Sequence, residues 1–412
     1  MNPRLFFGIG FFTLALSAGT ALAGSIEGPL QVIVSKDTQS LVVYDGDTVI
    51  ATSKVSTGKK GHSTPTGIFS ILEKKRYHES NIYSGAPMPF MQRLTWSGIA
   101  LHASNSVPDY PASHGCVRLP NKFAPLLYSM TNRGAHVVIS DRQLVPEQIS
   151  HRVLMQPETE AKTPLLLSDA QLRPAMEHAG TGSVEVAMNE TTSSTVAEPA
   201  EEKLPIRILI SRRGEREMNV DVQTLLTGLG FDAGVPDGFP GRQTRQAISD
   251  FQTAEKLTVD GKITPDLVTA LYAKAGKGTP ANGIIMVRQK FKPVFEAPIS
   301  IKDPEIALGT HFFQFQDTDT KTGKGEWFGL TMDNDLPKST MARLGITKTE
   351  DALAFNAAHR TLDRITIPEE TRKRIALLLA DGSSLSVSDT GLGQDTGDGT
   401  DFITITRRSP KG

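Results

Sequence analysis

Residues 113–118, with the sequence Ser-His-Gly-Cys-Val-Arg, place a thiol, an imidazole and a guanidinium close together. Cys116 is the only cysteine among the 412 residues, so it has no intramolecular disulfide partner. A cysteine nucleophile needs a base that generates the thiolate and hydrogen-bond donors that stabilise an oxyanion. His102, a short loop upstream, and the flanking His and Gly can supply both. An inert, buried cysteine is the alternative, but it leaves these neighbours unexplained.

The first residues are typical of an export signal. A basic start at Arg4 precedes an apolar run over 5–16 and a small-x-small pattern at 21–23. They predict a signal peptide over 1–23 and a mature chain from Gly24. An uncleaved anchor is the alternative, but the run is short for a membrane span of about 20 residues. We expect a periplasmic protein with no membrane span in its mature chain, where an unpaired cysteine favours a reactive role.

Charge offers no support for polyanionic partners. The chain has 44 Lys and Arg against 45 Asp and Glu, for a formal net charge of −1. We therefore expect no nucleic-acid partner and no electrostatic binding to lipid. The Gly- and Asp-rich stretch from Asp389 to Asp401 lacks the regular spacing of a calcium loop, which favours a solvated turn.

Composition divides the rest of the chain. Over 25–145, apolar residues alternate along predicted strands, and a hairpin turn is expected at 45–47. The segment 156–203 is rich in Glu, Ala, Ser and Thr and predicts a disordered linker. Over 204–278 we expect a short strand and then a small domain of three helices, the last capped by Thr264 with a proline after it.

The remaining segment, 283–408, predicts an α+β or β-rich domain. Residues 308–312 faintly echo the sequence near 66–69, which suggests a degenerate second copy of the first fold. This copy has no cysteine and cannot repeat the chemistry. The predicted fold class is multidomain: a mostly-β catalytic domain, a disordered linker, a small α-helical domain and a C-terminal β-rich domain.

Two parts of the chain resemble known families. The helical unit resembles the three-helix peptidoglycan-binding module, on residues that include Val222-Gln223, Leu229-Gly230-Phe231 and Phe251-Gln252. Residues 31–140 resemble the YkuD-type catalytic domain of L,D-transpeptidases. The motifs that carry this second resemblance are Thr64-Pro65-Thr66-Gly67-Ile68-Phe69, Gly98-Ile99-Ala100-Leu101-His102 and Ser113-His114-Gly115-Cys116-Val117-Arg118-Leu119. The resemblance implies a cysteine acylated by a peptidoglycan stem peptide, with no metal and no organic cofactor.

Chemistry and resemblance together predict the central roles. Cys116 is the predicted nucleophile. It needs a base, because a free thiol with a pKa of about 8.5 is only a few per cent thiolate at pH 7. His102 is the base, with a carbonyl near Ala103 holding its other ring nitrogen. The choice of His102 over His114 rests on the family, and His114 is expected to support the loop or the substrate.

The surrounding residues complete the predicted site. Gly115 permits close backbone approach, and its amide and that of Cys116 are candidate oxyanion donors. Ser113 is expected to hydrogen-bond His114 or the turn. Arg118 suits a bidentate grip on a substrate carboxylate, with a structural ion pair as the alternative.

The expected function is acyl transfer from a tetrapeptide stem through a Cys116 thioester. A second stem as acceptor would give a cross-link, and a lysine of an outer-membrane protein would attach that protein to the wall. An L,D-carboxypeptidase using water and a non-catalytic wall-binding protein remain alternatives. The linker is expected to act only as a tether, so truncation after about Lys203 should spare acylation of Cys116 and weaken binding to the wall. The competing interpretation has the C-terminal β region docking on the catalytic groove as a lid or activator.

Overall fold

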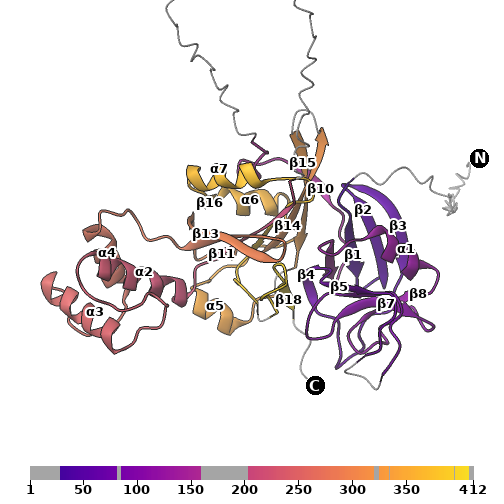
Figure 1. Ribbon diagram of the computed structural model, residues 1–412, viewed down its shortest axis with the longest axis horizontal. Helices are drawn as coiled ribbons and strands as arrows, with labels where there is room; N and C mark the ends of the chain where they lie inside the picture. The colour runs from indigo at the N-terminus through magenta and orange to yellow at the C-terminus, as the bar shows by residue number, and fades with distance from the viewer. Residues whose placement is uncertain are drawn as a thin grey trace, which may run out of the picture.

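The computed structural model describes residues 28–80, 85–158, 203–319, 324–333, 335–393 and 395–407. The predicted signal peptide over 1–23 lies outside these residues, as does nearly all of the predicted linker over 156–203. The described residues form an N-terminal β domain, a small helical module and a C-terminal sheet with helices (Figure 1). The predicted multidomain fold class is confirmed.

The N-terminal domain is built on two sheets. The first has the order β18-β4-β9-β1-β2-β3, and its strands are β1 (Gln31–Ser35), β2 (Ser40–Asp45), β3 (Thr48–Lys54), β4 (Thr66–Ser70), β9 (His136–Ser140) and β18 (Thr404–Arg407). The second has the order β5-β6-β7-β8, with β5 (Glu73–Lys75), β6 (Met91–Arg93), β7 (Ala100–Ser104) and β8 (Val117–Pro120). Helix α1 (Phe123–Met130) packs beside β7 and β8.

Both faces of the six-stranded sheet are buried along its central strands β1, β4 and β9. The inner face carries alternate apolar residues of β1, β2 and β9 and packs within the domain: Val32, Val34, Leu41, Val43, Val137 and Ile139. The other face also carries apolar residues and packs against the C-terminal sheet at Phe312, Leu330 and Met332. Strands of this kind read as continuous apolar runs, not as half-exposed alternation. Ile33 and Val42, which lie between the inner-face residues, are therefore buried as well.

The six-stranded sheet includes a strand from the far end of the chain. β18 pairs antiparallel with β4, with Thr404 opposite Ile68 and Ile405 opposite Gly67. Ile403 is buried in the core of the N-terminal domain. The chain after Lys203 thus completes the first domain, which counts against the expectation that truncation there would leave this domain unaffected.

The C-terminal sheet has eight strands in the order β10-β15-β14-β17-β11-β12-β13-β16. They are β10 (Glu147–Ile149), β11 (Ile206–Arg212), β12 (Gly283–Gln289), β13 (Lys292–Ile301), β14 (Thr310–Asp319), β15 (Lys324–Met332), β16 (Ile365–Thr366) and β17 (Ser384–Ser388). Helices α6 (Ala357–Asp363) and α7 (Glu369–Leu378) pack on one face, and α5 (Lys338–Leu344) lies at one end (Figure 1). This strand order differs from that of the six-stranded sheet, so it adds nothing to the suggestion of a degenerate copy.

The helical module is an insertion in a β-hairpin. β11 and β12 are antiparallel, and Arg212 is the register partner of Gly283. Between them lie α2 (Glu215–Gly228), α3 (Arg242–Ala254) and α4 (Pro265–Lys274). The predicted capping of α4 is confirmed, since the Leu267 N–H donates to Thr264 Oγ1 over 3.2 Å with Pro265 next. The predicted strand before the helices is β11, but it belongs to the C-terminal sheet.

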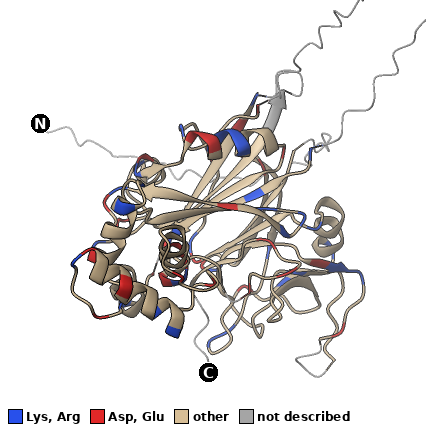
Figure 2. Cartoon of the chain, turned by 60° about the vertical axis from the view of Figure 1, so that its left-hand side comes forward, with Lys and Arg blue, Asp and Glu red and all other residues tan. Residues whose placement is uncertain are grey.

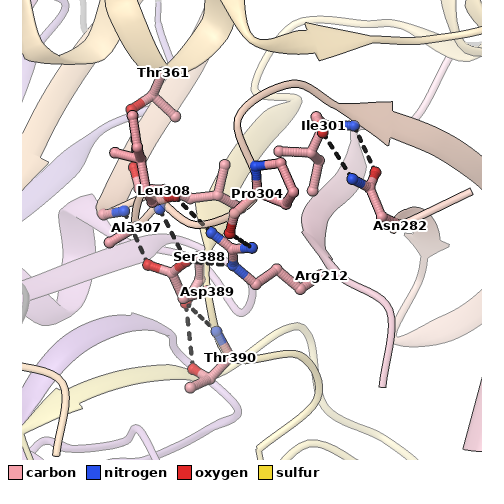
Figure 3. A network of polar contacts seen from close by, with 12 residues as sticks. Arg212, Asn282, Ile301, Pro304, Ala307, Leu308, Thr361, Ser388, Asp389 and Thr390 are labelled. Carbon is pink, nitrogen blue, oxygen red and sulfur yellow. Dashed lines mark hydrogen bonds and ion pairs between the residues drawn. The ribbon is translucent and has the colours of Figure 1, made fainter. Parts of the chain in front are cut away.

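A buried polar network fixes the base of this insertion (Figure 3). Arg212 Nε donates to the Asp389 carboxylate over 2.7 Å, and the Leu308 N–H donates to the same carboxylate over 2.8 Å. Asn282 bonds Ile301 through both its amide atoms, each over 2.7 Å. The chain therefore enters the module after the hydrogen-bonded Arg212 and leaves it at the hydrogen-bonded Asn282.

Charged residues of both signs are mixed over the described elements (Figure 2). No helix among the described residues has the length and apolar character that a membrane crossing requires.

Candidate active site

The candidate residues come from two adjacent parallel strands. β7 carries His102, β8 carries Arg118, and Cys116 immediately precedes β8. Successive side chains of a strand point to opposite faces, so Leu101, Val117 and Leu119 enter the core while His102 and Arg118 share the other face. The parallel register sets His102 directly opposite Arg118.

A pocket of about 100 Å³ lies on this second face. Five of the predicted residues line it together: Cys116, His102, Ser113, His114 and Arg118. The rest of its lining comes from Gly98 and from a wall made of Ser80, Ala86, Pro87 and Met88.

His102 is held in one tautomer. Its Nδ1 lies 2.8 Å from the Ala103 carbonyl oxygen, which can only accept a hydrogen bond. Nδ1 therefore carries the proton, and Nε2 is left with a free lone pair. The side chain is buried, and this burial lowers its pKa, with a smaller contribution in the same direction from Arg118. His102 is thus a neutral imidazole able to accept a proton at neutral pH.

Cys116 is held as a neutral thiol. Its Sγ lies 3.3 Å from the Gly98 carbonyl oxygen, to which the thiol donates. Burial raises the pKa of Cys116, while a hydrogen bond from the Ala100 backbone and the charges of Arg93 and Arg118 oppose that rise. Burial therefore favours the neutral form of each group, the thiol of Cys116 and the imidazole of His102.

Ser113 and Gly115 shape the turn before the nucleophile. Ser113 Oγ donates to the Cys116 carbonyl and accepts the Gly115 N–H over 3.1 Å, so Ser113 bonds the turn and not His114. Gly115 has a φ of +115°, a left-handed conformation that favours glycine. Because the Gly115 amide is already bonded to Ser113, the expectation that it donates to an oxyanion is not supported.

His114 lies at the rim of the pocket. It is exposed, and its ring centroid is 4.8 Å from that of His62, which is exposed as well. Partial burial lowers the pKa of His114, and the neighbouring Lys59, His62 and Arg118 add to this effect. This position suits contact with a substrate better than abstraction of the Cys116 proton.

Arg118 is half-buried, and its side chain lines the pocket. Its backbone bonds Ser56 in both directions, over 3.0 and 3.1 Å. None of the ion pairs within the described ranges involves Arg118, so the predicted structural ion pair is not found there. The guanidinium is instead directed to a pocket without acidic residues.

Comparison with known proteins identifies the family. Residues 29–139 match the family described as "L,D-transpeptidase catalytic domain", and residues 217–271 match "Putative peptidoglycan binding domain". A Bacillus subtilis (strain 168) protein named "Putative L,D-transpeptidase YqjB" is 31% identical over 150 residues. This alignment covers 32% of the present chain and 84% of that relative. The chain belongs to the L,D-transpeptidase family.

Solved L,D-transpeptidases are also similar to part of the chain. One from Mycobacterium smegmatis is 23% identical with a TM-score of 0.26, covering 27% of this chain and 58% of that one. One from Stackebrandtia nassauensis is 28% identical with a TM-score of 0.26, covering 28% and 58%. The chain thus spans less than two thirds of either solved protein. L,D-transpeptidases of this family are enzymes that transfer acyl groups.

Sequence reasoning missed three features of the transpeptidase domain near the thiol. The Gly98 carbonyl oxygen accepts a hydrogen bond from the Cys116 thiol. The sequence pointed to this residue only through the glycine that begins the 98–102 motif. Arg93 contributes a positive charge from β6, where it pairs with Glu73 over 3.0 Å. Thr64 contacts the backbone directly before Cys116, and it had been noted only as part of a motif.

Proposed function

We propose that this L,D-transpeptidase acts on peptidoglycan stem peptides through a Cys116 thioester. One observation carries the proposal: Cys116 and His102 line the same pocket, and His102 is fixed in the tautomer that leaves Nε2 able to accept a proton. A general base that raises the nucleophile's reactivity is the requirement for acyl transfer by a neutral thiol. The peptidoglycan-binding module supports the choice of substrate.

The proposed acylation follows from this geometry. His102 Nε2 takes the Cys116 proton as Sγ attacks the carbonyl carbon of the peptide bond before the terminal residue of a tetrapeptide stem. The C–N bond then breaks, and His102 returns the proton to the departing amine. A thioester between Cys116 and the stem remains.

Three further groups are assigned to binding. The Cys116 N–H is the candidate donor to the oxyanion, because the Gly115 amide is bonded to Ser113. Arg118 is the candidate for holding a stem carboxylate, since a guanidinium matches the two oxygens of that group. His114, at the rim, is proposed to contact the stem.

Deacylation decides what the enzyme makes. Attack on the thioester by an amine of a second stem gives a cross-link, and attack by a protein lysine attaches that protein to the wall. Attack by water would make the enzyme an L,D-carboxypeptidase. We propose the first outcome as the principal reaction, in a periplasmic, wall-associated protein exported by its 1–23 segment.

The proposed domain organisation follows the sequence boundaries, with a catalytic domain over 25–145, a linker over 156–203, a binding module within 204–278 and a C-terminal domain over 283–408. Residues 402–407 are added to the catalytic domain, because β18 lies in its sheet.

Product analysis tests the function directly. The purified mature protein is incubated with disaccharide-tetrapeptide, and the products are resolved by mass. We expect a dimer that has lost one terminal residue, and none with Cys116→Ser. A tripeptide product alone would establish hydrolysis instead, and no product with intact protein would favour the non-catalytic alternative.

A further inference from the structure

Thr64 is hydrogen-bonded to the turn of residues 113–116 that carries Cys116, here called the nucleophile turn. Its side chain is 1% exposed. Thr64 Oγ1 donates to the Gly115 carbonyl over 2.8 Å and accepts the Gly58 N–H over 2.8 Å. One hydroxyl therefore links two loops, and both of its bonds are made in a site closed to water.

The bond to Gly115 acts on the next residue. In a planar trans peptide, the carbonyl of one residue and the N–H of the next point in opposite directions. Fixing the Gly115 carbonyl toward Thr64 therefore fixes the Cys116 N–H away from Thr64. This N–H is the proposed oxyanion donor, so Thr64 sets its direction without touching substrate.

The second bond of Thr64 ties it to a loop that also holds the turn. Gly58 is bridged to Ser113, and the Lys59 N–H donates to the Ser113 carbonyl over 3.0 Å. Ser113 in turn bonds both Gly115 and Cys116. The nucleophile turn is thus held at its start through Ser113 and at its end through Thr64.

The C-terminal strand restrains Thr64 from the other side. Two residues later, Thr66 Oγ1 lies 2.8 Å from Thr406 Oγ1, and β18 pairs along β4. A Cβ on Gly67 would lie 2.2 Å from the Thr404 carbonyl oxygen, so only glycine lets β18 lie this close. The Thr-Pro-Thr-Gly motif therefore joins the last strand to the nucleophile turn.

We propose that Thr64 is a positioning residue that aims the Cys116 N–H, and that β18 holds Thr64 in place. The proposal rests on the proposed function, because it concerns the same thioester chemistry. It assigns a role in the reaction to residues at the opposite end of the chain.

A comparison of two cysteine reagents in the full chain tests Thr64. Carbapenem acylation passes through an oxyanion, whereas alkylation by iodoacetamide needs only the thiolate. Thr64→Val keeps the shape and removes both bonds, so we expect acylation to slow by roughly 10- to 100-fold. Alkylation should change less than about threefold, and Thr64→Ser, which keeps the hydroxyl, should restore acylation.

The outcomes separate this proposal from the proposed function. If the parent protein is not acylated at Cys116, the proposed function fails. If the parent is acylated and Thr64→Val reacts as fast, only the positioning role is overturned. Equal losses with both reagents would show a merely structural role, and so would failure of Thr64→Ser to restore acylation.

Gly67→Ala tests the contribution of β18. The added methyl should displace the strand, so amide hydrogen exchange over 404–407 should rise and acylation should slow while alkylation is retained. Thr406→Val, which removes only the hydroxyl contact with Thr66, should have the smaller effect. Faster exchange without slower acylation would overturn the role of β18, and so would exchange that does not change.

Discussion

His102 and Arg118 are direct partners in the parallel register of β7 and β8. The guanidinium therefore lies beside the base, and its charge contributes to lowering the pKa of His102 and opposes the rise in that of Cys116. One residue thus acts on both members of the proposed catalytic pair.

Arg118→Gln should raise the pKa of both groups, because it removes a nearby positive charge that lowers the pKa of His102 and opposes the rise in that of Cys116. At a fixed pH near 8, a higher pKa of Cys116 leaves a smaller fraction of it as thiolate than in the parent protein. Iodoacetamide should therefore alkylate Cys116 more slowly in the variant. The measurement is the alkylation rate against pH. Arg118→Lys, which keeps a charge, should follow the parent, and identical profiles for all three proteins would contradict the electrostatic role.

Carbapenem labelling tests the nucleophile. Because Cys116 is the only thiol of the chain, the added mass should lie on the peptide that contains it. Intact-protein and peptide mass spectrometry provide the readout. Cys116→Ser should remain unlabelled, and labelling that survives this substitution would exclude Cys116 as the nucleophile.

Removal of the proposed base should slow acylation without unfolding the protein. His102→Ala is expected to lower the acylation rate by roughly 10²- to 10⁴-fold, the usual contribution of a general base. His114→Ala, at the exposed rim, is the matched control and should lose less. The reverse order of the two variants would assign the base to His114.

The hairpin insertion allows the wall-binding module to be removed cleanly. The Arg213 N–H donates to the Asn282 carbonyl over 3.1 Å, so the two ends of the module already pair. Replacing residues 214–281 by Asn-Gly should close the hairpin with a two-residue turn. We expect weaker sedimentation with peptidoglycan sacculi and an acylation rate within about twofold of the parent.

This deletion replaces truncation after Lys203, which would also remove β18. Unchanged binding to sacculi after the deletion would show that the module does not hold the wall. A large loss of acylation in the folded variant would instead show that the module contributes to the active site.

His311 predicts a loss of stability in acid. Burial lowers its pKa to about 4, whereas the unfolded chain keeps the ordinary value of 6.5. Between these values the unfolded chain binds a proton that the folded chain does not, so the free energy of unfolding falls as pH drops from 6.5 to 4. The full effect is about 3 kcal/mol.

Urea unfolding at several pH values measures this effect. His311→Asn should reduce the slope of stability against pH by up to about 1.4 kcal/mol per pH unit within this window. An unchanged slope would show that other groups cause the acid sensitivity.

Local sequence patterns predicted the local structure well. The place of His102 in the same pocket as Cys116 depends on the pairing of β7 with β8, and it is expected from the family resemblance. The Thr264 cap and the three helices of the module follow instead from short-range spacing. These features depend on backbone periodicity and capping, which act within a few residues.

The missing parts depend on contacts between distant residues. The apolar residues Ile33 and Val138 indicate that both faces of their strands are covered. The sequence does not show what covers the second face, because their partner Phe312 lies in another domain. The register of β18 against β4 and the choice of Ser113 partner likewise depend on tertiary packing. Short strands such as Thr404–Arg407 contain too little information to specify which sheet edge they join.

The pairing of Thr66 with Thr406 spans 340 residues of sequence. The six-stranded sheet therefore cannot close while the chain is still being made, and β4 remains an open edge until residues 404–407 have emerged. Open edges invite pairing with other chains, and contacts between such distant residues form slowly. Synthesis consequently delivers Cys116 early, whereas the domain that carries it reaches its final fold only when the last strand has been made.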